Sequence, residues 1–308
     1  MSKLTVSVSP HIHSGRTTTK IMLDVIIALL PATIAGVVIF GLRALLVIGV
    51  TVGASVGFEA LFNLIVKRKQ TIGDLSAIVT GLLLALNLPA NIPIWQCVIG
   101  ALFAIIIVKC LFGGLGYNPV NPAITARVFM LIAFGSMAKG AFPTIVDTVA
   151  TSTPLSAETM PKLLDLFLGV HGGAIGETCA LALLVGGIYL LVRRVISWEI
   201  PVSFILTVFV FAFFKEGFDF TLALSQVLAG GVMIGAFFMA TDYVTSPSTL
   251  FGKLIFGVLI GLITSLIRYF GSYPEGVSFA ILFANILVPY INVWTRRRVF
   301  GTGVEGNE

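Results

Sequence analysis

Long apolar runs separated by short polar connections dominate this chain. They form two sets of five, on either side of a polar stretch from about 138 to 175. The runs cover about 21–41, 44–66, 72–88, 93–112, 121–137, 176–193, 199–214, 222–240, 252–270 and 277–295. A helix of about 20 apolar residues is long enough to cross a bilayer. The pattern therefore predicts an all-α polytopic membrane protein with about ten transmembrane helices.

The same pattern predicts five parts along the chain. They are an N-terminal tail (1–20), a first transmembrane repeat (21–137), an external loop (138–175), a second transmembrane repeat (176–295) and a C-terminal tail (296–308).

Composition supports a membrane protein and excludes two other classes. Of the 308 residues, 57% are hydrophobic and 11% are charged, whereas a soluble domain carries roughly 25% charged residues. The chain has too little polar surface for a soluble globular enzyme. It is also far too hydrophobic to be intrinsically disordered.

The positions of Lys and Arg predict the orientation. Every second connection carries basic residues: Lys67, Arg68 and Lys69 in one, Lys109 in the next, and Arg193 and Arg194 in the third; the C-terminal tail adds Arg296, Arg297 and Arg298. Cytoplasmic connections of membrane proteins are enriched in Lys and Arg. Both tails are therefore expected in the cytoplasm of a cell (inner) membrane protein, with the 138–175 loop outside. The net charge of +5 then needs no nucleic acid to explain it.

The two halves share a candidate internal repeat, with chance similarity between Gly- and Phe-rich membrane segments as the alternative. GLLLALNLPANIP (81–93) and GAFFMATDYVTSP (235–247) each carry an apolar run into a loop that contains Pro. A further span follows in both halves, and then Lys109 or Arg268 precedes Phe-Gly and a Tyr-Pro region. Because five spans is an odd number, the copies would be inverted. Inverted repeats with broken helices that meet near the midplane commonly form a substrate or cofactor cavity.

The external loop contains an accessible hydroxyl motif, Asp147-Thr-Val-Ala-Thr-Ser-Thr153-Pro154-Leu155. Pro154 disfavours a helical conformation at Thr153. The Thr153 hydroxyl is therefore expected on an extended segment that a modifying enzyme could reach, although an ordinary polar loop has the same composition.

Several motifs in order resemble the family of flavin-bearing membrane subunits of Rnf complexes and sodium-pumping quinone reductases (the NqrB/RnfD family). The similarity covers nearly the whole chain and is greatest to the RnfD branch, which belongs to the Rnf ion-translocating ferredoxin:NAD oxidoreductase. It rests on the loop motif and on GGLGYNPVNPA (113–123), MATDYVTSP (239–247), KLIFGVLIG (253–261) and YPEGVSFAILFANILVP (273–289).

The resemblance implies that FMN is joined through its phosphate to the Thr153 hydroxyl, with Asp147 and Ser152 in the same motif. A flavin transferase would form this phosphoester on the outer face from FAD. The tether leaves the flavin ring to carry the redox chemistry. Ala150, Thr151 and Ser152 depart from the residues more usual in the family, which leaves Thr151 as a less favoured attachment site.

The resemblance further implies a second, non-covalent flavin such as riboflavin. Asn118 and Asn121 stand beside prolines in GYNPVNPA, a composition that suits a broken helix lining a cavity. Both are candidate flavin contacts, and helix breaking alone is the alternative.

Ionisable residues within apolar runs are candidates for ion binding because they are costly in hydrocarbon. Asp242 and Thr241 are candidate Na⁺ ligands, with Thr245 and Ser246 nearby. The alternative for each carboxylate is an ion pair with a neighbouring Lys or Arg. Other ionisable candidates are Asp24, Glu59, Arg127 and Glu275.

The expected function is that of a membrane flavoprotein that couples electron transfer between ferredoxin and NAD to Na⁺ or H⁺ translocation. The chain has no Rossmann or P-loop fingerprint and no iron–sulfur cysteine pattern, so partners are required. The resemblance implies the other Rnf subunits: RnfA and RnfE in the membrane, the flavin protein RnfG, the NAD-side protein RnfC and the iron–sulfur protein RnfB. Two alternatives remain: the corresponding NqrB component of a sodium-pumping NADH:quinone reductase, and a cofactor-free inverted-repeat transporter or channel.

Overall fold

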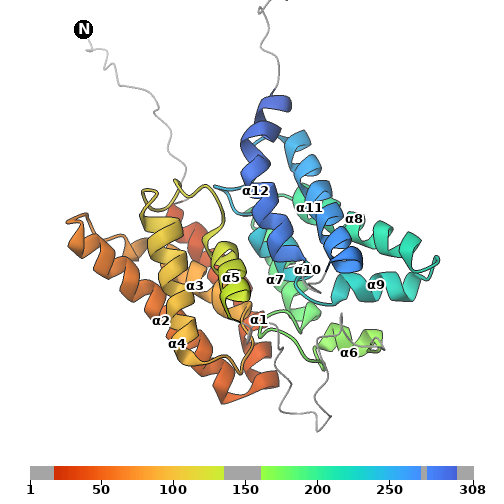
Figure 1. Ribbon diagram of the computed structural model, residues 1–308, viewed down its shortest axis with the longest axis horizontal. Helices are drawn as coiled ribbons and strands as arrows, with labels where there is room; N and C mark the ends of the chain where they lie inside the picture. Colours follow the sequence, from red (N-terminus) through yellow and green to blue (C-terminus); the bar gives the residue numbers. More distant parts are fainter. Residues whose placement is uncertain (1–16, 135–160, 272–275, 297–308) are drawn as a thin grey trace, which may run out of the picture.

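A computed structural model describes residues 17–134, 161–271 and 276–296. The regular elements of these residues are all helices, as Figure 1 shows. Four of the helices are long and apolar enough to cross a membrane: α1 (Thr18–Phe40), α2 (Leu42–Ile65), α11 (Leu250–Phe270) and α12 (Val277–Trp294). The predicted all-helical membrane protein is therefore confirmed.

Shorter helices occupy the remaining apolar runs. They are η1 (Ile72–Asp74), α3 (Ser76–Leu86), α4 (Ile94–Leu102) with the π-helical η2 (Phe103–Cys110), α5 (Pro122–Ala133), α6 (Leu163–Leu168), α7 (Ala180–Val192), α8 (Glu199–Lys215), α9 (Phe220–Leu228), α10 (Val232–Ile234) and the π-helical η5 (Gly235–Met239). The axis of α9 and the axis of the helical segment Val232–Met239 differ by 65°, with a short break between them.

By length and composition, the described residues contain four membrane-spanning helices, or five if the bent pair is one span. The sequence pattern predicts about ten. The difference has a local cause: α3 begins only at Ser76, after η1, and ends at Leu86, before Asn87 and Pro89, while Gly230 and Gly231 separate α9 from α10. Polar residues, Pro and Gly stop these helices short of a full crossing.

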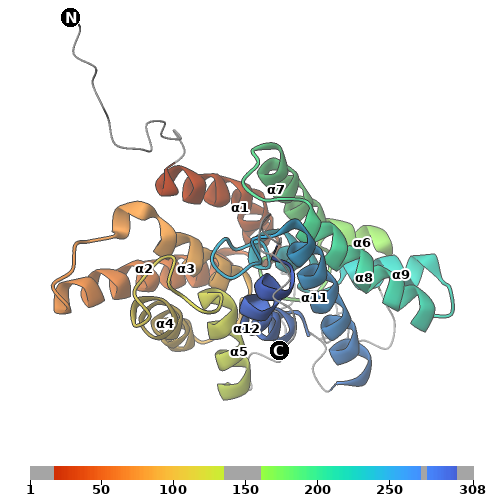
Figure 2. The same ribbon diagram turned by 90° about the horizontal axis from the view of Figure 1, so that it is seen from above.

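Each half packs around one long helix. In the first half, α2 contacts both α3 and α4; in the second, α8 contacts both α9 and α11. The halves meet through two pairs, α1 against α7 and α5 against α12. Figure 2 shows α12 near the centre of the molecule.

Two glycines make this packing possible. Gly41 has φ 74° and lies alone between α1 and α2, a left-handed conformation that only Gly adopts at no cost. Gly186 lies where α7 crosses α1. A Cβ there would be 3.0 Å from the Phe238 ring and closer still to the Ala28 carbonyl oxygen.

One end of the bundle, here called the terminal face, holds both outer ends of the described chain. The start of α1 reaches the α2–α3 connection there, through Thr19 Oγ1 and the Gly73 carbonyl (3.3 Å). The end of α7 and the start of α11 join it through hydrogen bonds from Arg193 to Asp24 and from Lys253 to Ser197 (3.3 and 2.9 Å). Thr249 meets Thr295, after the end of α12, at 2.5 Å.

The described end of the predicted external loop, 171–175, and the next residue, Gly176, are buried. Gly176 N–H donates to the Leu86 carbonyl at 2.7 Å, and Ile175 N–H donates to the Leu88 carbonyl at 3.1 Å. The segment thereby satisfies carbonyls that the end of α3 leaves without helical partners. His171 is buried beside it, and the short helix α6 also falls inside the predicted loop.

Candidate functional site

The four described residues predicted to bind a cofactor or cation line one pocket, here called the central pocket. Asn118 and Asn121 approach it from the segment before α5, and Thr241 and Asp242 from the segment after η5. Its volume is about 90 Å³, enough for a few water molecules or a partly hydrated cation. The pocket thus combines residues from both halves of the chain.

Asn121 connects the two halves directly. Its side-chain oxygen accepts from the Ala123 and Ile124 N–H groups (3.0 and 3.3 Å) and so caps α5. Its Nδ2 donates to the Met239 carbonyl at 3.3 Å, at the end of η5. Asn118 has a more local role, because its Nδ2 donates to the Val120 carbonyl (3.1 Å).

Thr241 and Asp242 differ in what they contribute to the pocket. The Thr241 hydroxyl donates to the Phe237 carbonyl at 2.7 Å. The Asp242 carboxylate accepts from the Thr245 hydroxyl at 3.1 Å and, within the described part of the chain, forms no salt bridge. Within the described chain no salt bridge therefore occupies this carboxylate, and carboxylate oxygens suit hard cations.

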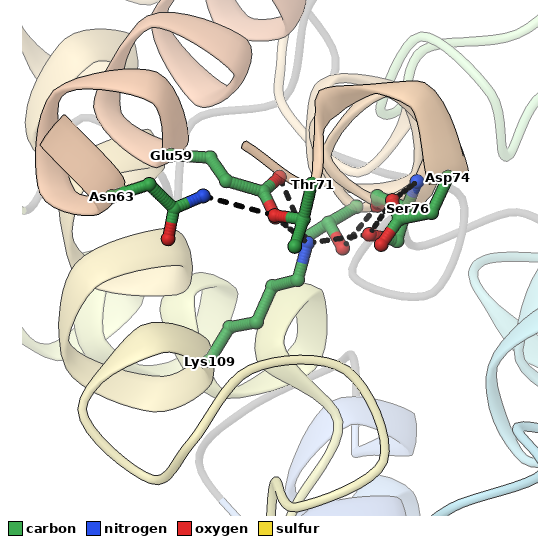
Figure 3. A network of polar contacts seen from close by, with 7 residues as sticks. Glu59, Asn63, Thr71, Asp74, Ser76 and Lys109 are labelled. Atoms are coloured by element: carbon green, nitrogen blue, oxygen red, sulfur yellow. Dashed lines mark hydrogen bonds and ion pairs between the residues drawn. The ribbon is translucent and has the colours of Figure 1, made fainter. Parts of the chain in front are cut away.

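The wall of the pocket near the start of α3 is a buried polar network, drawn in Figure 3. Lys109 Nζ lies 3.0 and 3.1 Å from the two Glu59 carboxylate oxygens and donates to Ser76 Oγ at 2.6 Å. Thr71 donates to the same carboxylate at 2.7 Å, and Asn63 donates to Thr71 at 3.0 Å. Charges removed from water in this way need such partners to be tolerated.

Lys109 was predicted to mark a cytoplasmic connection, and the structure places it elsewhere. It lies within η2 and its side chain is 2% exposed. Sequence alone could not distinguish a lysine in a connection from a lysine in the last turn of a helix, because either stands at the end of an apolar run.

A second buried ion pair lies where the broken helices meet. Arg127, on α5, donates to the Asn87 side-chain oxygen after α3 and to the Glu177 carboxylate before α7. A Cβ at Gly231, between α9 and α10, would lie 2.8 Å from that carboxylate. The sequence indicated Arg127 alone. No sequence pattern indicated a role for Glu177 or Asn87: each is a single polar residue near glycine or proline.

Asp24 has partners on another helix. Tyr189 donates to its carboxylate at 3.0 Å and Arg193 at 3.3 Å, both from the end of α7. Asp24, Glu59 and Glu177 are therefore ion-paired carboxylates. Asp242 differs from them because it forms no salt bridge within the described chain.

The predicted flavin attachment site, Thr153, lies outside the described residues, as do Asp147, Ser152 and Glu275. Their proposed roles rest on the sequence.

Comparison with known proteins assigns the chain to a family. The model of the NQR2, RnfD, RnfE family matches residues 5–301. The chain belongs to this family. The resemblance expected from the separate motifs is thereby confirmed over almost the entire sequence.

Curated relatives match the chain over nearly their whole length. The RnfD protein of the Na⁺-translocating ferredoxin:NAD⁺ oxidoreductase complex of Acetobacterium woodii is 48% identical, over 97% of this chain and 95% of the relative. Its counterpart in the proton-translocating complex of Clostridium ljungdahlii is 40% identical, over 97% and 96%. The counterpart in the ion-translocating oxidoreductase complex of Actinobacillus succinogenes is 38% identical, over 99% of each. Relatives of this family member are thus subunits of redox enzyme complexes.

Proposed function

We propose that this chain is the RnfD component of an Rnf-type complex, which couples electron transfer between ferredoxin and NAD to translocation of Na⁺ or H⁺. The observation that carries the ionic part is the central pocket, where Asp242 stands beside Thr241, Asn118 and Asn121 without a salt-bridge partner in the described chain. The names of the curated relatives support the redox part. They favour this complex over a quinone reductase and over a cofactor-free transporter.

The central pocket is proposed as a cation site. Carboxylate, hydroxyl and amide oxygens are ligands for hard cations, and a carboxylate also takes up a proton. The end of η5 faces the pocket, and the C-terminal carbonyls of a broken helix are a common feature of cation sites in transporters. A negative charge introduced nearby would favour cation entry, because charges interact strongly in low dielectric.

The inverted repeat is proposed as the architecture behind this pocket. Equivalent positions of the two sequence repeats behave alike: Asn87 donates to the carbonyl of Leu83 (2.6 Å), and Thr241 donates to that of Phe237 (2.7 Å). Equivalent helices also pack on each other, α1 against α7 and α5 against α12. Counting each broken helix with its connection as one crossing gives ten crossings, with the terminal face in the cytoplasm of the cell membrane.

Covalent FMN on Thr153 remains a proposal from the motif, and a non-covalent flavin near Asn118 and Asn121 is a separate one. With a pocket volume of about 90 Å³, a flavin ring would require side chains such as Phe237 and Phe238 to move. We therefore assign the pocket first to the cation. The other Rnf proteins (RnfA, RnfB, RnfC, RnfE and RnfG) and the flavin transferase are the proposed partners.

In-gel flavin fluorescence tests the cofactor. The full chain is co-expressed with a flavin transferase and denatured beside Thr153→Val and Thr151→Val variants. We expect a fluorescent band in the wild type and in Thr151→Val, and none in Thr153→Val. A dark wild-type band with active transferase would refute the redox proposal. Fluorescence that disappears only in Thr151→Val would move the attachment site. Flavin released on denaturing Thr153→Val would support the non-covalent flavin.

A further inference from the structure

A second cavity opens at the terminal face, beside the central pocket but chemically different from it. It has a volume of about 730 Å³ and lies between the α7–α8 connection (193–198) and the segment from η5 to the first turn of α11. We call it the basic pocket; the residues that define its chemistry are Arg194, Ser197, Trp198, Ser246, Ser248 and Lys253.

The charge of the basic pocket is of one sign. Among the described residues, its lining contains the two cations Arg194 and Lys253 and several hydroxyls, and no Asp or Glu. The neighbouring carboxylates in sequence, Asp242 and Glu199, do not line it. A cavity with this lining is complementary to an anion that accepts several hydrogen bonds.

Arg194 is positioned through its backbone and Lys253 through its side chain. Arg194 has φ 54°, and its N–H donates to the Leu191 carbonyl (3.0 Å) in the turn that ends α7. Lys253 lies in the first turn of α11, where its Nζ donates to Ser197 Oγ at 2.9 Å. The start of this 21-residue helix adds a partial positive charge on the same side.

The position of the pocket matches the headgroup level of a bilayer. The pocket lies among the ends of apolar helices, and its Trp198 is 55% exposed; Trp is enriched at the membrane–water interface. Apolar side chains of Leu191 and Ile200 form another part of the lining. The cavity therefore offers a cationic end and an apolar side together. Basic pockets between membrane helices on the cytoplasmic side bind anionic lipid headgroups.

We propose that the basic pocket binds the phosphate headgroup of an anionic phospholipid such as phosphatidylglycerol. Arg194 and Lys253 contact the phosphate, the serine hydroxyls donate to it, and the glycerol and upper acyl chain lie against Leu191 and Ile200. The pocket shares Thr241 and Tyr243 with the central pocket, and the Tyr243 hydroxyl donates to the Val195 carbonyl. A bound lipid would hold together the two segments that close the central pocket on this face.

The test titrates delipidated full-length protein in detergent with mixed micelles of dioleoylphosphatidylglycerol, dioleoylphosphatidylcholine or no lipid, or with inorganic phosphate. Thermal unfolding and native mass spectrometry report binding. The key variant is Arg194→Gln/Lys253→Gln. The matched control is Arg68→Gln/Lys69→Gln, which removes two exposed cations after α2 that do not line the pocket.

We expect phosphatidylglycerol to stabilise the wild type and the control, with one lipid retained in the mass spectrum. The double variant should bind it roughly thirtyfold more weakly. If that variant does not fold, Arg194→Gln alone should weaken binding roughly fivefold. Equal stabilisation by phosphatidylcholine, equal stabilisation by inorganic phosphate, or an equal loss in the control would each overturn the proposal.

Discussion

The Asn121 side chain donates to the main-chain carbonyl of Met239, 3.3 Å away. This contact joins the start of α5 in the first half of the chain to the end of the broken helix in the second half. The same side chain caps α5, so that one amide orders both borders of the central pocket.

Replacing Asn121 with Ala should therefore destabilise the protein more than replacing Asn118. Asn121→Ala loses a helix cap, worth about 0.5–2 kcal/mol, and a buried hydrogen bond, worth about 0.5–1.5 kcal/mol. Asn118→Ala loses one local bond to Val120 and serves as the control. Thermal unfolding in detergent measures both. Equal effects would show that neither the cap nor the contact with Met239 contributes measurably.

Close packing of α1 on α7 gives the second prediction. A Leu at Gly186 cannot be accommodated beside Ala28 and Phe238 without separating the helices, and overpacking of this kind costs about 1–3 kcal/mol or more. We expect Gly186→Leu to lower the unfolding temperature strongly. Gly53→Leu, on α2, is the matched control because a Cβ there meets no atom within 4 Å. A tolerated Gly186→Leu would contradict the α1–α7 packing.

The buried ion pair between Glu59 and Lys109 gives the third prediction. Glu59→Gln leaves a lysine ammonium that is 2% exposed without its counter-charge, which costs about 3–5 kcal/mol. The double variant Glu59→Leu/Lys109→Met removes both charges and should recover most of that loss in a denaturant titration. Failure of Glu59→Leu/Lys109→Met to recover the loss would mean that the charge itself is needed.

Breaking the Asp24–Arg193 pair with Asp24→Asn should cost about 1 kcal/mol or less, because the Arg193 side chain is 57% exposed.

The sequence predicted some parts of this structure closely and others poorly, for physical reasons. Runs at 21–41 and 252–270 became α1 (Thr18–Phe40) and α11 (Leu250–Phe270), because an uninterrupted apolar run leaves a helix as the one way to satisfy its backbone in lipid. The run at 72–88 became η1 and α3 instead.

Prediction of the candidate site from the sequence was limited in the same way. The motifs indicated Asn121 and Asp242 separately, but their meeting in one pocket depends on contacts between distant segments. Glu177 was missed altogether, since a single carboxylate in a glycine-rich segment has no periodic signal. Its importance follows from Arg127, which contacts it only in the folded chain.

Asp242 gives the last prediction, which addresses the proposed translocation directly. In the assembled complex in proteoliposomes, Asp242→Asn should lower the ratio of Na⁺ or H⁺ moved per electron roughly tenfold or more, because a carboxylate close to a cation contributes at least a few kcal/mol in low dielectric. Covalent flavin fluorescence should stay unchanged, since the proposed phosphoester forms on the Thr153 hydroxyl. Asp24→Asn is the control: it also removes a carboxylate, but one that pairs with Arg193 and does not line the pocket. Uptake of ²²Na⁺ and quenching of a pH-sensitive dye distinguish the two ions. An unchanged ratio for both in Asp242→Asn would remove the central pocket from the ion path.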